Sequence, residues 1–157
     1  MRLTHLSSIV LLSIVLIGCV LNTRRDPATI TFNEAVELLR QAEDYAQSGD
    51  ISSLCNMSDA VQACLEEFSR LEGKAAIPSD SPTIVKTYVL PDVLLDNGNT
   101  LLGGRVLVIQ GVDGRGHSYR TEWLVFDRGN NKLTPRTPIY WSRISIVTPQ
   151  NAADPFK

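Results

Sequence analysis

The stretch Gly104-Arg105-Val106-Leu107-Val108-Ile109-Gln110-Gly111-Val112 decides the fold class of this chain. Its centre, from Val106 to Ile109, is a run of aliphatic and mostly β-branched side chains, which is typical of a β-strand. The next apolar run, from His117 to Arg128, follows the turn-forming residues Asp113-Gly114-Arg115-Gly116. Two such runs joined by a short glycine-containing turn predict a β-hairpin.

Further strands are expected on both sides of this hairpin. Thr83 to Leu90 has strand character and is ended by Pro91. A last strand is predicted within Ile139 to Val147, after a turn at residues 129–132 and an irregular stretch containing two prolines. The segment from Val93 to Leu102 contains Asp96-Asn97-Gly98-Asn99, a strong turn signal, and forms either a small hairpin or a loop.

Helical patterns precede all of these strands. Thr31 and Glu34 have the spacing of a capping box, so a first helix begins there and Gly49 ends it. Asp50 caps a short second helix over residues 51–55, and Ser58 is the expected N-cap of a third helix that Gly73 stops. Residues 74–82 have the composition of a linker.

Three helical segments followed by about four antiparallel strands predict a single α+β domain over residues 31–147, with a flexible tail at 148–157. Within the strand at 117–128, Trp123 and Val125 lie on one face, and Glu122 and Leu124 lie on the other. Neither face is fully polar. We therefore expect a curved sheet that has helices on one side and another element on the other.

This order of elements resembles the NTF2-like (cystatin-like) superfamily. The sequence Ala46-Gln47-Ser48-Gly49-Asp50 is similar to the exit of the first helix in those domains, and the meander ending at Tyr140-Trp141 is similar to their sheet. The resemblance covers about residues 31–147. It implies N-terminal helices packed into a bent, cone-shaped antiparallel sheet, in which a pocket can bind a small ligand.

The first residues carry a second resemblance. Arg2 is followed by an apolar segment of about twelve residues, which suits a signal peptide and is too short to span a bilayer as a helix. Leu16-Ile17-Gly18-Cys19 at its end resembles the lipobox of bacterial lipoproteins. The small Gly18 suits the peptidase, and Cys19 supplies a nucleophilic sulfur. An ordinary signal anchor with a chance cysteine is the alternative.

The lipobox resemblance implies where the protein works. Residues 1–18 would be removed, and Cys19 would carry acyl chains such as palmitate that bind membrane lipid. Residues 19–30 would then form a short tether between Cys19 and the domain. The expected location is the extracytoplasmic face of the cell membrane, or the outer membrane where the envelope has one.

Cys55 and Cys64 remain as an even pair in an extracytoplasmic setting. They form either a disulfide, which would close a loop of about ten residues, or two buried free thiols. With no histidine nearby, they lack the ligand set of a metal site, so no metal is expected.

Candidate catalytic groups are few. His117 follows a glycine-rich turn and should be exposed, and Glu122 and Asp127 are expected to be surface carboxylates on a strand. We therefore predict no enzyme activity and no cofactor. Four large aromatic residues of the sheet belong either to the core or to a ligand pocket. They are Tyr88, Trp123, Tyr140 and Trp141.

The net charge of the chain bears on the kind of partner it binds. The formal net charge is −2, and no global basic excess indicates nucleic-acid binding. The sequence therefore predicts a membrane-anchored, non-catalytic binding or interaction module whose partner is a protein or a small ligand. Two alternatives stay open: a structural subunit of an envelope complex, and a small NTF2-like enzyme with a cone-shaped pocket.

Overall fold

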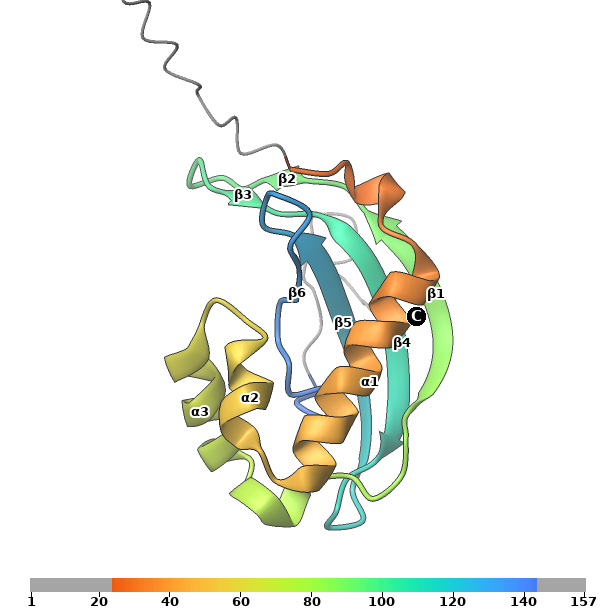
Figure 1. Cartoon of the computed structure of the whole chain (residues 1–157), viewed down its shortest axis with the longest axis vertical. Coiled ribbons are helices and arrows are strands. Elements are labelled where there is room, and N and C mark those ends of the chain that lie inside the picture. The colour runs from red at the N-terminus through yellow and green to blue at the C-terminus, as the bar shows by residue number, and fades with distance from the viewer. Residues whose placement is uncertain (1–23, 144–157) are drawn as a thin grey trace, which may run out of the picture.

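Figure 1 shows helices packed across one face of a curved sheet. This computed structural model describes residues 24–143; the predicted signal peptide, Cys19 and the predicted tail lie outside the described residues. The fold is α+β, as the sequence predicts. Its α-helices are α1 (Phe32–Ser48), α2 (Ile51–Asn56) and α3 (Val61–Arg70), with 3-10 turns η1 (Pro27–Thr29) and η2 (Gly73–Ala76). Its strands are β1 (Thr83–Leu90), β2 (Val93–Leu94), β3 (Thr100–Leu101), β4 (Gly104–Val112), β5 (Ser118–Asp127) and β6 (Leu133–Pro135).

The main sheet is an open antiparallel sheet with the strand order β1-β4-β5-β6. Strand β4, the stretch that decides the fold class, lies between β1 and β5, and Leu107 pairs with Thr87 on one side and Trp123 on the other. At the start of β4, the backbones of β4 and β5 come very close. A Cβ atom on Gly104 would lie 1.9 Å from the carbonyl oxygen of Val125, so this position requires glycine.

The predicted helix signals are confirmed for α1 and α2. Thr31 and Glu34 form the capping box, Gly49 ends α1 with φ +74°, and the Asp50 side chain accepts a hydrogen bond from the Ser53 amide. The predicted start of α3 is wrong, because Ala60 is the N-cap. The Ser58 hydroxyl instead closes the turn after α2, where it donates to the Cys55 carbonyl and accepts from the Ala60 amide.

The two faces of the sheet pack against different partners. On the helix side, Leu39 of α1 and Leu54 of α2 share a core with Leu107 and Trp123. On the opposite face, Val106 and Leu124 form a smaller cluster with Leu90 and with Leu101 of β3. This second cluster confirms the expectation that another element contacts the other face, and it explains why neither side of β5 is fully polar.

The segment between β1 and β4, predicted as either a small hairpin or a loop, is a hairpin. Strands β2 and β3 pair as a two-stranded antiparallel hairpin, with Val93 opposite Leu101. The polar residues Asp96 to Asn99 make its turn, in which the Leu95 amide donates to the Asn99 carbonyl at 2.8 Å. We call residues 93–101 the β2–β3 hairpin.

The prediction of a last strand within Ile139–Val147 is wrong for residues 139–143, the part of it that the structure describes. Residues 139–143 form no strand, and residues 144–147 lie outside the described residues. The strand that completes the sheet is β6, which pairs Leu133 with Asp127. The reason is visible in the burial, since Ile139, Tyr140 and Trp141 are all buried in succession. They follow the sheet as an irregular segment that fills the core.

Cys55 of α2 and Cys64 of α3 form a disulfide, and both residues are buried. The bridge joins two short helices that follow one another in the chain. Of the two arrangements that the sequence leaves open, the structure has the bridge rather than two free thiols.

The double variant Cys55→Ala/Cys64→Ala should lower the free energy of unfolding by about 2.5–3 kcal/mol, because the bridge closes a loop of about ten residues. Denaturant titration with and without a reductant measures this, and the double variant should not respond to the reductant. Two reactive thiols at positions 55 and 64 in the unreduced, denatured protein would contradict the bridge.

Candidate functional site

The first described residues are bound to the domain. We call Arg24, Arg25, Glu34, Asp92 and Asp127 the N-terminal clamp, because these side chains hold the start of the chain. The sequence assigns residues 19–30 to a tether. In the structure, residues 24–30 instead lie against β4, β5 and the start of α1, so the chain is already bound to the domain at Arg24, the first described residue.

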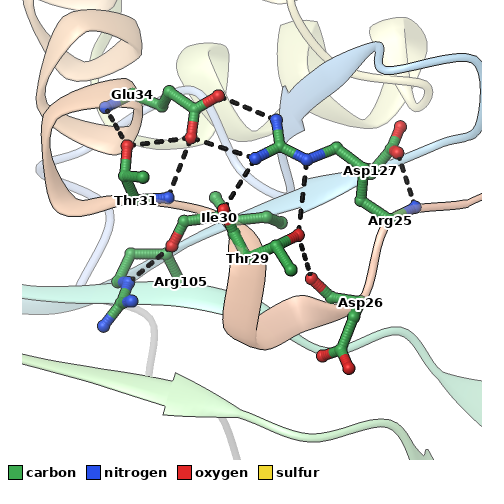
Figure 2. Close-up of polar contacts among 8 residues, drawn as sticks. All are labelled: Arg25, Asp26, Thr29, Ile30, Thr31, Glu34, Arg105 and Asp127. Atoms are coloured by element: carbon green, nitrogen blue, oxygen red, sulfur yellow. Dashed lines mark hydrogen bonds and ion pairs between the residues drawn. The ribbon is translucent and has the colours of Figure 1, made fainter.

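Asp127 lies at the centre of the clamp, and its fractional exposure is 0%. One carboxylate oxygen accepts from the Arg25 amide at 2.8 Å, and the other accepts from the Gly129 amide at 2.8 Å (Figure 2 draws the first). Its carbonyl oxygen also accepts from Arg24 Nε. The expectation of a surface carboxylate at this position is wrong, because the chain before α1 covers the end of β5.

Arg25 joins the clamp to the capping box of α1. Its Nη1 and Nη2 atoms bind the two Glu34 carboxylate oxygens at 2.7 and 3.2 Å, and Nη2 also donates to the Thr29 carbonyl (Figure 2). Glu34 in turn accepts from the Thr31 amide at 2.8 Å. The hydrogen bond from Arg25, together with that from Thr31, lowers the pKa of Glu34 to about 2.

Arg24 binds both ends of the β2–β3 hairpin. Its Nη1 and Nη2 atoms donate to the Asp92 carboxylate at 2.7 and 2.9 Å, and Nη2 also donates to the Gly103 carbonyl at 2.9 Å. Asp92 also accepts from the Gly103 amide at 2.6 Å. The Arg24 guanidinium lowers the pKa of Asp92. One arginine therefore fixes the base of the hairpin to the start of the described chain.

Two clefts flank this region. An open cleft of about 570 Å³ runs along the clamp, between Arg24 to Ala28 and the end of β1. A second cleft of about 390 Å³ lies between the β2–β3 hairpin and β6. We call the second one the Arg136 cleft. Its apolar lining is Leu95, Leu101, Leu102, Phe126 and Pro135, and Arg136 and Asp59 contribute charged groups.

The Arg136 cleft combines apolar walls with one cation, the Arg136 guanidinium, which forms no ion pair within residues 24–143. Asp59, the acid of the same cleft, is paired with Arg128. Desolvation lowers the pKa of Arg136, although the residue as a whole is exposed. Apolar walls beside a single cation suit an amphiphilic ligand that has an acidic group.

The four aromatic residues proposed for a pocket do not meet at one place. Trp123, Tyr140 and Trp141 are buried together in the helix-side core, where Tyr140 and Trp141 have ring centroids 4.9 Å apart. Tyr88 lies on the opposite face, and its hydroxyl donates to Glu122 at 2.8 Å. The clefts described above are lined by other residues.

The remaining candidates from the sequence are also separated. His117 is exposed in the β4–β5 turn, with Nδ1 3.7 Å from a carboxylate oxygen of Asp113. Glu122 is buried rather than on the surface, so that expectation is wrong. Cys19 lies outside the described residues. Sequence reasoning missed Arg136 and the clamp, because no local spacing links residues so far apart in the chain.

No family model, no curated protein and no solved structure matches this chain. Within residues 24–143 there is no group of His, Cys, Asp and Glu side chains that could hold a metal ion. No helix in that range is long and apolar enough to cross a membrane.

Arg25→Ala should lower the free energy of unfolding by about 1–2 kcal/mol, because it removes charge-assisted hydrogen bonds to a partly exposed partner. Arg40→Ala is the matched control, since Arg40 on α1 makes only an exposed contact of 3.7 Å with Glu37 and should change stability by less than about 0.5 kcal/mol. Denaturant titration followed by tryptophan fluorescence compares them, and equal effects would contradict the clamp.

The clamp also predicts a pH dependence. Folding lowers the pKa of Glu34 from 4.5 to about 2, so its contribution is complete above pH 4.5 and is lost as the pH falls towards 2. The stability difference between the unmodified protein and Glu34→Gln should therefore be constant above pH 4.5 and shrink below it. Denaturant titrations at several pH values measure the difference, and a gap that stays constant down to pH 2 would count against the interaction.

Proposed function

We propose that this chain is a lipoprotein, anchored through acylated Cys19 on the extracytoplasmic face of a membrane, whose domain is a non-catalytic binding module. The observation that carries the proposal is the sequence Leu16-Ile17-Gly18-Cys19 at the end of a short apolar segment. The Cys55–Cys64 disulfide supports it, because structural disulfides persist in oxidising, extracytoplasmic compartments.

The clamp supports a position close to the membrane. Cys19 precedes Arg24 by five residues, and five residues of extended chain span at most about 18 Å. Because Arg24 is held by Asp92 and Asp127, the domain cannot move further away by unfolding the start of its chain without breaking the clamp. An anchored domain would therefore remain near the lipid surface.

The Arg136 cleft supports the binding role. Its volume of about 390 Å³ is in the range of small-molecule sites, and its walls are largely apolar. We propose that it binds a small amphiphile with an anionic group. The finer assignment to the NTF2-like superfamily belongs to the same proposal, and its support is the long helix α1 packed on a bent antiparallel sheet.

Cys19→Ser should release the chain from the membrane fraction or leave it unprocessed, because the serine hydroxyl cannot accept the lipid in place of the thiol. Membrane fractionation and the mass of the mature protein measure this. A variant with unchanged mature mass and unchanged membrane association would overturn the lipoprotein proposal.

Arg136→Ala should weaken binding of a short anionic amphiphile several-fold, because it removes the cation of the cleft. Saturation-transfer NMR on the full protein, with hexanoate as the probe and hexanol for comparison, measures this. Arg40→Ala should retain the hexanoate signal. Equal signals from hexanoate and hexanol, or no loss in Arg136→Ala, would rule the cleft out as an anion site.

A further inference from the structure

The tip of the β2–β3 hairpin exposes leucine side chains. Leu94 has a fractional exposure of 72%, the highest among the large exposed apolar residues of the described chain, and Leu95 beside it is 36% exposed. Exposed leucines at the end of a projecting hairpin lose the hydrophobic contribution that burial would provide. Their place beside the entry of the chain is what gives these exposed leucines a partner to contact.

The hairpin and the start of the described chain lie at the same end of the molecule. Figure 1 shows β2 and β3 beside the red start of the coloured ribbon, at the end opposite the β4–β5 turn. The two are joined directly, because the Arg24 guanidinium binds Asp92 and the Gly103 carbonyl on either side of the hairpin. The direction of the hairpin is therefore fixed relative to the point where the chain enters the domain.

The lengths of chain on both sides of this junction are short. Cys19 lies at most about 18 Å of extended chain from Arg24. Leu94 lies two residues beyond Asp92, or about 7 Å along a strand. If Cys19 is held at a bilayer surface, the tip of the hairpin is within reach of the same surface.

We propose that the tip of the β2–β3 hairpin docks onto the lipid surface that holds Cys19, with the Leu94 side chain inserted among the lipids. This inference rests on the lipid anchor of the proposed function. The hairpin lies along the surface, so that the polar turn Asp96 to Asn99, which follows Leu94 at the end of the hairpin, stays at the level of the headgroups and remains hydrated. The domain would have two contacts with the membrane, which together fix its orientation.

A tryptophan placed at the tip tests the proposal. The mature full chain carrying Leu94→Trp is reconstituted into vesicles of phosphatidylcholine with brominated acyl chains, which quench nearby indoles. The native Trp123 and Trp141 are buried in the protein core, so their emission is subtracted using the unmodified chain. Emission from the new tryptophan should fall roughly twofold relative to unbrominated vesicles and shift to shorter wavelength.

Val112→Trp is the matched control, because Val112 is 52% exposed at the opposite end of β4. Its emission should not change with bromination. Vesicle flotation on the same samples separates the two claims. A chain that floats without quenching at position 94, or with equal quenching at position 112, overturns the hairpin contact and leaves the anchor standing. A chain that does not float overturns the anchor, and the hairpin contact falls with it.

The alternative to a lipid contact is that a partner protein covers the β2–β3 hairpin. In that case Leu94→Trp would remain unquenched on vesicles, and Leu94→Asn would lower the recovery of a co-purified protein from solubilised membranes while Val112→Asn would not. That pair of results would also overturn the lipid contact.

Discussion

The position of the chain before α1 depends on one constraint, the buried carboxylate of Asp127. A carboxylate removed from water must be hydrogen-bonded, or its burial is strongly unfavourable. The Arg25 and Gly129 amides meet that requirement, one on each carboxylate oxygen. Satisfying Asp127 therefore requires the chain before α1 to cover the end of β5. This brings Arg25 to Glu34 and Arg24 to Asp92.

Because of this constraint, the two ends of the molecule differ. One end carries the entry of the chain and the β2–β3 hairpin, and the other end carries the β4–β5 turn (Figure 1). The Arg136 cleft lies beside the hairpin. The proposals for the anchor, the ligand and the lipid contact all concern the first end. In the proposed arrangement, a fixed entry point would keep this end of the domain nearer the membrane than a free tether would.

The sequence predicted those features whose causes are local. The capping box of Thr31 and Glu34, the left-handed Gly49, and strands β1 and β4 depend on neighbouring residues, and the structure has each of them as predicted. The errors concern contacts between distant residues. Nothing local distinguishes Asp127 from a surface carboxylate, and the chain that covers it, including Arg25, is about 102 residues away in the sequence. The Arg136 cleft was missed for the same reason, since its walls come from separate parts of the chain.

Hydrogen exchange at the Arg25 backbone amide shows whether Asp127 holds the entry of the chain. If Asp127 holds the entry of the chain, this amide should exchange as slowly as amides in the paired part of β5, because its proton is bonded to a buried carboxylate. In Asp127→Ala it should exchange at the rate of an unstructured peptide while the amides of β4 stay protected. An Arg25 amide that exchanges at the unstructured rate in the unmodified protein would show that residues 24–30 are a free tether, and would contradict the account.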